Sequence, residues 1–195
     1  MASLPPEYFD RLYASAPDPW NFATSAYEEA KYAATLAALP ASRYTSALEI
    51  GCSIGILTAM LADRCDALLG VDVAQSALAQ ARAHNATRLH VNFRRGQFPN
   101  AMPVGCGDSG YDLILLSEVL YYLDQTTLID AALATLKMAQ PGADILLVHW
   151  LGPTPDYPLT GEQAAGQFIA ALSSDVQLLT QSRTPQYRID LLRRK

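Results

Sequence analysis

Short apolar runs alternate with helical patterns along most of the chain. The apolar runs occupy residues 47–50, 67–73, 89–93, 111–117 and 144–150. A continuous run of this length is typical of a strand buried on both faces, whereas apolar residues at every third or fourth position are typical of an amphipathic helix. Helical patterns fill most of the intervals, at 54–62, 75–84 and 126–139. The alternation predicts an α/β fold in which a mainly parallel sheet carries helices on both faces.

The amino-terminal part departs from this alternation. Residues 7–13 have helical spacing, and Ser25 and Glu28 fit a capping box that begins a second helix continuing toward Pro40. We therefore expect a helical cap over residues 1–40 and a core over residues 41–195, within one compact domain.

The carboxyl-terminal part also changes character. A helical pattern at 161–172 precedes strand patterns at 176–181 and 187–192. These patterns predict an antiparallel hairpin at the edge of the sheet, which makes seven strands with the five apolar runs. The terminal residues 191–195 could suggest an anionic partner, but we expect them to form a frayed, solvated tail.

The overall charge argues against polyanionic partners. The chain has 195 residues, of which 50% are hydrophobic, and 14 Lys and Arg against 19 Asp and Glu give a formal net charge of -5 at pH 7. A net negative protein has no general attraction for a phosphate backbone or an anionic membrane. We therefore expect a small-molecule partner and neither nucleic acid nor membrane. The oligomeric state stays open.

The cysteines and the amino terminus indicate a cytoplasmic protein. Cys52, Cys65 and Cys106 are odd in number and form no Cys-x-x-Cys pair, which suits a reducing compartment. They predict neither a disulfide framework nor a metal site. The first residues have no basic stretch ahead of an apolar one, and no apolar run is long enough to cross a membrane.

The turn after the first strand has the residues of a ligand site. Gly51, Ser53 and Gly55 follow the strand end, and small residues let a ligand approach the backbone. A dinucleotide fingerprint would need glycines at 51, 53 and 56, and Ser53 and Ile56 break it. Asp72 ends the next strand, about twenty residues after Gly51, where an acid can accept both hydroxyls of a ribose. The turn therefore predicts a nucleoside cofactor without a pyrophosphate.

These residues resemble the first two motifs of class I S-adenosylmethionine-dependent methyltransferases. The motif is Glu49-x-Gly51-x-Ser53-x-Gly55 followed by Asp72, with Ser53 where the family usually has glycine. The resemblance implies a Rossmann-like fold and S-adenosylmethionine as cofactor, with S-adenosylhomocysteine as product. It places Glu49 in support of the turn, and Asp72 at the ribose. The further cofactor contacts that it implies are Gly51, Cys52, Ser53 and Gly55 at the methionine part, with Val73 and Ser117 beside them.

The adenine site of the same resemblance falls after the third strand. Gln97 stands where many relatives have an acid, and its carbonyl and amide could meet the adenine amino group and a ring nitrogen. Gln97 is otherwise an exposed loop residue. Phe98 lies against the adenine or belongs to the core.

The ends of the fourth and fifth strands carry candidates for the reacting side. The fourth strand lacks the Asn/Asp-Pro-Pro-Tyr motif of enzymes that methylate nucleic-acid bases. Glu118, Tyr121 and Tyr122 could instead hold an amine and receive its proton, although Glu118 could also contact the cofactor or cap a helix. His149 could be a general base or a structural histidine.

A second resemblance covers residues 18–150. Asp18-Pro19-Trp20, then Ser25-Ala26-Tyr27-Glu28-x-x-Lys31-Tyr32, and then Ser117-Glu118-Val119-Leu120-Tyr121-Tyr122 resemble the nodulation protein S (NodS) family of N-methyltransferases. That family methylates the free amine of a deacetylated chitooligosaccharide. The resemblance implies that the amino-terminal helices cover the cofactor. Trp20 or Tyr27 would then face the sulfonium, and Lys31 the methionyl carboxylate. The alternative is that both aromatics pack in the core and Lys31 is solvated.

Together these features predict N-methylation of a small-molecule amine such as an amino sugar. The alternatives are O-methylation of a small metabolite and a binding module without chemistry, while Ser53 and Ile56 disfavour an NAD-dependent oxidoreductase. We expect acceptor choice to depend on the amino-terminal helices and on the loops at 94–109 and 151–160.

Overall fold

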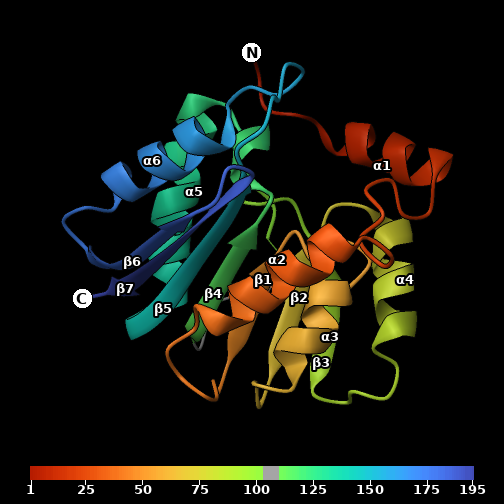
Figure 1. Cartoon of the computed structure of the whole chain (residues 1–195), viewed down its shortest axis with the longest axis horizontal. Helices are drawn as coiled ribbons and strands as arrows, with labels where there is room; N and C mark the ends of the chain where they lie inside the picture. Colours follow the sequence, from red (N-terminus) through yellow and green to blue (C-terminus); the bar gives the residue numbers. More distant parts are fainter. Residues whose placement is uncertain (103–109) are drawn as a thin grey trace.

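A seven-stranded sheet runs through the centre of the protein in the order β3-β2-β1-β4-β5-β7-β6 (Figure 1). The computed structural model describes residues 1–102 and 110–195. The strands are β1 (Ala47–Ile50), β2 (Leu68–Asp72), β3 (Val91–Arg95), β4 (Tyr111–Ser117), β5 (Ala139–Trp150), β6 (Val176–Arg183) and β7 (Tyr187–Arg194). β1 to β5 are parallel, and β7 runs antiparallel between β5 and β6. The predicted α/β class, mainly parallel sheet and carboxyl-terminal hairpin are confirmed.

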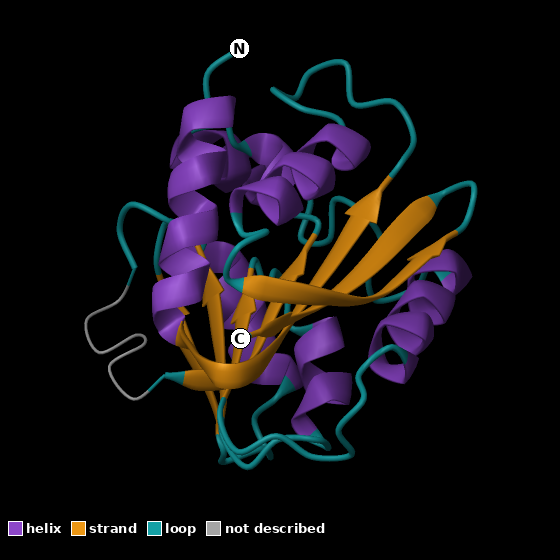
Figure 2. Ribbon diagram, turned by 90° about the vertical axis from the view of Figure 1, so that its left-hand side faces the viewer, coloured by secondary structure: helices purple, strands orange, loops and turns teal. Residues whose placement is uncertain are grey.

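Helices cover both faces of this sheet (Figures 1 and 2). They are α1 (Pro6–Ser15), α2 (Ala26–Ala37), α3 (Ile56–Ala62), α4 (Gln75–His84), the 3-10 helix η1 (Leu120–Tyr122), α5 (Gln125–Met138) and α6 (Gly161–Ala171). One core cluster joins Tyr32 of α2 and Leu61 of α3 to the strands, and a second joins Leu128 of α5 and Phe168 of α6 to the opposite face. α1 packs beside α4 at the end of the sheet (Figure 1).

The amino-terminal segment is tied to the segment between β4 and α5. Leu4 N donates to Tyr122 O at 2.9 Å, and the Ser3 hydroxyl donates to Asp124 Oδ2 at 2.7 Å. Asp124 also caps α5 through Thr127 N. α1 therefore begins beside the edge of the sheet where the parallel strands end, which is the edge that holds ligands in open α/β sheets.

Two local predictions at the carboxyl end were wrong. β5 begins at Ala139, five residues earlier than expected: the chain passes Gly142 in the left-handed region (φ 81°), and the pairing with β4 shifts register between Tyr111 and Leu113. The expected tail 191–195 is instead the end of β7 as far as Arg194: Arg193 donates to Asp144 Oδ1 at 2.7 Å, and Arg194 donates to Ala139 O.

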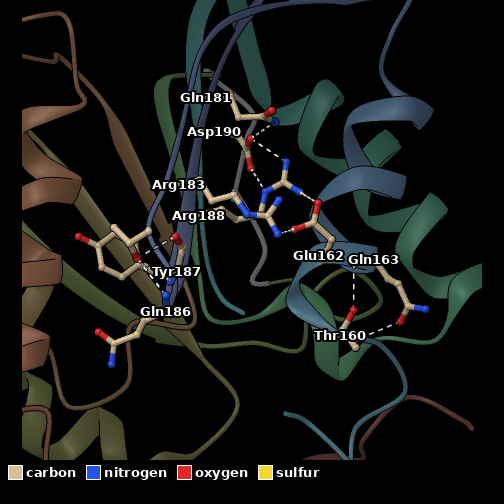
Figure 3. A network of polar contacts seen from close by, with 10 residues as sticks. Thr160, Glu162, Gln163, Gln181, Arg183, Gln186, Tyr187, Arg188 and Asp190 are labelled. Carbon is tan, nitrogen blue, oxygen red and sulfur yellow. Dashed lines mark hydrogen bonds and ion pairs between the residues drawn. The ribbon is translucent and has the colours of Figure 1, made fainter. Parts of the chain in front are cut away.

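A polar network fixes the first turn of α6 to β7 (Figure 3). Arg188 and Asp190 are 5% and 0% exposed, and the guanidinium donates to both carboxylate oxygens at 2.8 Å. Arg188 also donates to Glu162 of α6 at 2.9 Å, and Arg183 of β6 pairs with the same carboxylate. α6 itself begins at a capping box formed by Thr160. The network therefore holds α6 over the carboxyl end of β5 and the amino end of β7.

Candidate functional site

A cavity of about 580 Å³ opens at the carboxyl ends of the parallel strands. Its walls come from α1, α2, the turn after β1, the end of β2, η1 and the loop after β5. The residues expected at the cofactor all line it: Trp20, Lys31, Glu49, Gly51, Cys52, Ser53, Gly55, Asp72, Val73, Gln97, Phe98 and Ser117. Glu118 and Tyr121 line it as well, whereas His149 does not. The fold thus gathers two of the three expected catalytic residues with the expected cofactor residues.

The turn after β1 has a backbone that glycine favours. Gly51 and Gly55 have φ of 76° and 77°, and Ser53 between them has φ of 51°. A Cβ at Gly51 would overlap the Val119 side chain, so the turn and the segment after β4 approach each other closely. The Ser53 hydroxyl bonds the Tyr13 hydroxyl of α1, which gives a serine at this unfavourable φ a partner.

Asp72 holds the same turn from the end of β2. Its Oδ2 accepts from Ser53 N and its Oδ1 accepts from Ala74 N, both at 2.9 Å. Burial raises the pKa of Asp72, and the hydrogen bonds from Ala74, Ser53 and Val73 oppose that rise. Each carboxylate oxygen has a second lone pair, so the side chain can support the turn and still accept hydroxyl donors.

Glu49 lies beneath the turn and is 2% exposed. Thr58 of α3 donates its hydroxyl to Glu49 Oε2 at 2.6 Å. Burial raises the pKa of Glu49 to about 7, against the lowering effect of the Thr58 bond. Glu49 therefore joins β1 to α3, which agrees with the supporting role expected for it.

Aromatic side chains close the cavity next to this turn. Trp20 stacks on Phe22, with ring centroids 5.4 Å apart, and meets Tyr13 edge to face at 5.7 Å. Gln97 pairs through its backbone with Ala101 at 2.8 Å, and Phe98 is 7% exposed within a core cluster while also lining the cavity. The alternatives stated for Phe98 are therefore compatible. Part of the expected specificity loop, residues 103–109, lies outside the described residues.

Glu118 is the most constrained polar residue of the reacting side. It has φ of 56°, a left-handed conformation that is costly for a residue with a side chain. Oε1 accepts from Lys31 Nζ at 2.7 Å, and Oε2 accepts from the Tyr121 hydroxyl at 2.7 Å and from Trp150 N at 2.9 Å. Three elements therefore fix one carboxylate at the cavity wall.

Lys31 has partners that the sequence did not reveal. It is 2% exposed and contacts the carboxylates of Glu28, at 2.9 Å, and Glu118. Its ammonium also lies 5.2 Å from the centre of the Tyr27 ring. Burial lowers the pKa of Lys31, but the carboxylates of Glu118 and Glu28 outweigh that effect and raise it. Lys31 is therefore a buried cation within the cavity wall, and the alternative of a solvated lysine is excluded.

The Ser25 cap of α2 shows why Glu28 is free to reach Lys31. Ser25 accepts from Glu28 N at 3.4 Å, which is one half of the expected capping box. The Glu28 side chain contacts Lys31 in place of the return bond to the backbone of Ser25. The helix begins where the sequence predicted, but its cap is the single bond from Glu28 N to the Ser25 hydroxyl and not the full capping box.

Tyr8 and Tyr157, which the sequence did not single out, join Tyr121 and Tyr122 in an aromatic wall. Tyr157 stacks on Tyr121 with centroids 5.4 Å apart and meets Tyr122 edge to face at 4.8 Å. Tyr8 of α1 also lines the cavity, and its pKa is raised to about 12 by burial and by its hydrogen bond with Tyr157. These rings come from α1, η1 and the loop after β5, so only the fold brings them together.

His149 lies behind the wall of the cavity. It is 0% exposed, and its Nε2 accepts from Leu120 N at 3.2 Å. Burial lowers the pKa of His149 to about 4, an effect that the Glu118 and Asp190 carboxylates oppose. The geometry does not favour the expectation of a general base, because the ring has no access to the cavity.

Comparison with known proteins identifies the family of this chain. The family model of nodulation protein S (NodS) matches residues 10–148. The chain belongs to the NodS family. The nodulation protein S of Bradyrhizobium diazoefficiens is 34% identical over 120 residues, which are 61% of this chain and 56% of that protein. The chain therefore spans about half the length of the curated NodS relatives that it matches.

Solved structures share the fold of this NodS-family chain. The N-methyltransferase NodS of Bradyrhizobium japonicum, solved with S-adenosylhomocysteine, has a TM-score of 0.82 at 23% identity, covering 96% of this chain and 97% of that one. A solved protein from Pseudomonas syringae has a TM-score of 0.71 at 34% identity, covering 86% and 99%. The class I methyltransferase fold expected from the sequence is confirmed. No helix among residues 1–102 and 110–195 combines the length and the apolar character needed to cross a membrane.

Proposed function

We propose that this chain transfers a methyl group from S-adenosylmethionine to the amine nitrogen of a small molecule such as an amino sugar. The observation that carries the proposal is a single cavity that contains both the turn after β1, with Asp72, and the Glu118 carboxylate. Membership of the NodS family supports the same reaction, as does the N-methyltransferase described for the Bradyrhizobium japonicum protein.

The residues present fit the cofactor. The cavity of about 580 Å³ lies within the range of about 300 to 1,000 Å³ that small-molecule sites occupy. The glycine turn allows close approach at the methionine part, Asp72 has free lone pairs for the ribose, and Gln97 has both a donor and an acceptor for the adenine. S-adenosylmethionine, when bound, supplies an electrophilic methyl group on a sulfonium centre.

The charge of the cavity favours cationic and neutral ligands. Its acidic residues are Glu28, Glu49, Asp72, Glu118 and Asp156. Among the described residues that line the cavity, Lys31 is the only Lys or Arg. Such an excess of carboxylates attracts a sulfonium and an amine and disfavours an acceptor that carries phosphate or carboxylate near the reacting nitrogen.

Glu118 is the group best placed to handle the acceptor's proton. Burial and the neighbouring Glu118 raise the pKa of Tyr121, so the phenol stays protonated and acts as a donor. Lys31 stays cationic, and His149 does not line the cavity. In the proposed reaction Glu118 orients the amine by a hydrogen bond and accepts the proton that the nitrogen loses. The surrounding aromatic wall excludes water and keeps the nitrogen within about 3 to 3.5 Å of the reacting carbon.

Calorimetry with S-adenosylhomocysteine tests the cofactor half of the proposal. Asp72→Ala should weaken binding by about 10- to 100-fold, because one or two hydrogen bonds of about 1 to 1.5 kcal/mol each are lost. Asp66→Ala is a matched control, since that exposed carboxylate pairs with Arg43 away from the cavity. A wild-type protein that does not bind the nucleoside would refute the assignment.

A product assay tests the acceptor half. Isotopically methyl-labelled S-adenosylmethionine is incubated with amino sugars and with their hydroxyl counterparts, and mass spectrometry locates the label. Label on nitrogen supports the proposal, and label on oxygen identifies an O-methyltransferase. Tight nucleoside binding without any methylated product identifies a binding module. Glu118→Gln should lower kcat by about 100-fold, the scale of general acid–base catalysis, with unchanged affinity for S-adenosylhomocysteine.

A further inference from the structure

His149 has a constrained environment that the proposed chemistry does not use. It is the last residue but one of β5, on the sheet face that α6 covers, and it pairs in register with Arg188 of β7. The Tyr121 ring meets the imidazole edge to face, with centroids 5.7 Å apart. A Cβ at Gly161, the first residue of α6, would lie 3.3 Å from His149 Cβ. The imidazole is therefore enclosed by β7, η1 and α6.

The hydrogen bond to Leu120 determines the proton position on this ring. Leu120 N is a backbone donor and lies 3.2 Å from His149 Nε2, so Nε2 must supply a lone pair. The proton of the neutral ring then lies on Nδ1, which has no hydrogen-bond partner among the described residues. Protonation of Nε2 would place two donors against each other. The geometry thus requires a neutral histidine that accepts from the backbone.

This hydrogen bond acts on the segment that carries the reacting side chains. Leu120 begins η1, and the first N–H groups of a helix have no partner within the helix. Glu118 lies two residues earlier with φ of 56°, and Tyr121 follows directly and donates to Glu118 Oε2 at 2.7 Å. Loss of the acceptor at His149 would release the start of η1 and, with it, the orientation of Tyr121.

We propose that His149 is a positioning residue: its neutral imidazole holds Leu120 N and the Tyr121 ring so that Tyr121 fixes the Glu118 carboxylate toward the acceptor amine. The proposal rests on the proposed N-methyl transfer. It assigns to His149 neither proton transfer nor contact with the substrate.

The charged groups around His149 are themselves held in place. The Asp190 carboxylate accepts from Nε and Nη2 of Arg188 (Figure 3), and the Glu118 carboxylate accepts from the Lys31 ammonium. These four groups, on β7, α2 and the segment after β4, are the charges that act on the imidazole. Because each is paired, none needs His149 as a partner, and the ring can stay neutral across the physiological range.

Two substitutions separate positioning from proton transfer. His149→Gln keeps an oxygen acceptor near the position of Nε2, whereas His149→Leu removes it. We expect His149→Leu to lower kcat for a chitosan tetrasaccharide at least tenfold, with the affinity for S-adenosylhomocysteine within twofold of wild type. His149→Gln should recover most of kcat and keep the wild-type dependence of kcat on pH between 6 and 8. His90→Leu is the matched control, because His90 contacts Ala62 O outside the cavity.

The ring can also be observed directly in the full chain. Long-range proton–nitrogen correlation spectra at pH 7 should show His149 protonated on Nδ1 alone, a result that does not depend on turnover or on the folding of any variant. A doubly protonated ring or an Nε2-protonated ring would overturn the proposal. So would a His149→Leu protein with wild-type kcat, or a His149→Gln protein that loses a pH-dependent limb of activity. Failure of the wild type to methylate any amine would instead refute the proposed function.

Discussion

Alanine at Gly55 should destabilise the protein more than alanine at Gly142, although both glycines have nearly the same backbone conformation. Gly55 has φ of 77° and Gly142 has φ of 81°. The surroundings differ: a Cβ at Gly55 would lie 2.9 Å from Ala81 Cα and Cβ and from Asn85 Nδ2, whereas a Cβ at Gly142 would have nothing within 4 Å. The pair therefore separates the cost of the conformation from the cost of the contact.

The magnitudes follow from these contacts. A left-handed conformation costs a residue with a Cβ about 1 to 2 kcal/mol. Alanine also lowers the conformational entropy of the unfolded chain, which stabilises the folded protein by about 0.4 to 1 kcal/mol at either site. At Gly55 the overlap with the α4 backbone adds about 1 to 3 kcal/mol, as overpacking does. Displacement of Asn85, which donates to Gly55 O at 3.0 Å, adds about 1 kcal/mol. We expect a loss of about 1 kcal/mol for Gly142→Ala and about 2 to 5 kcal/mol for Gly55→Ala.

Urea unfolding followed by circular dichroism at pH 7.5 measures both values. Calorimetry with S-adenosylhomocysteine supplies a second readout, because Gly55 lines the cavity and Gly142 does not. We expect Gly55→Ala to bind the nucleoside at least tenfold more weakly and Gly142→Ala to bind it as the wild type does. Equal destabilisation of the two variants would refute the contact argument, and unchanged binding by Gly55→Ala would refute the placement of the nucleoside.

The remaining predictions concern buried charges, all measured by urea unfolding. The folded pKa of Glu49, about 7, exceeds its ordinary value of about 4.5, so its protonation stabilises the protein below pH 4.5 and this stability is lost as the pH rises through 7. The free energy of unfolding of Glu49→Gln, relative to that of the wild type, should therefore rise by about 2 kcal/mol from pH 5 to 7.5. The pH dependence at His149 has the opposite sign, because its folded pKa of about 4 lies below the ordinary value of 6.5. The free energy of unfolding of the wild type should fall by about 2 kcal/mol relative to that of His149→Gln when the pH falls from 7.5 to 5. A difference that does not change with pH would contradict the burial of the ring. Arg188→Met should cost about 3 to 5 kcal/mol by leaving Asp190 buried and unpaired, and adding Asp190→Leu should restore much of the loss; equal stability of the single and double variants would argue against an uncompensated charge.

The sequence predicted the sheet well because its signals are local. Apolar runs identified each parallel strand, and the prediction differed from the structure mainly at element ends such as Ala139, where the strand begins ahead of the apolar run and continues through Pro141 and Gly142. The sequence also predicted the turn after β1 from Gly51 and Gly55, since a backbone with positive φ favours glycine. Ser53 was the exception, and its explanation, a bond to Tyr13 from α1, lies 40 residues away in the sequence.

The reacting side was less accessible to sequence reasoning. Glu118 and Tyr121 were found because they follow a strand end, but the Lys31 pairing with Glu118 spans 87 residues and the Tyr8 and Tyr157 wall unites distant segments. Tyr8 appeared only as part of an apolar helix stripe.

The sequence by itself determined the order of strands and helices along the chain, the glycine turn after β1 and the acid at the end of β2, because each depends on spacing and on the backbone preferences of neighbouring residues. Tertiary structure alone decided which side of the cavity wall His149 occupies, which carboxylates neutralise Lys31, and how three tyrosine-bearing segments meet. The physical reason is that burial and charge pairing depend on distances between segments, and no local pattern records those distances.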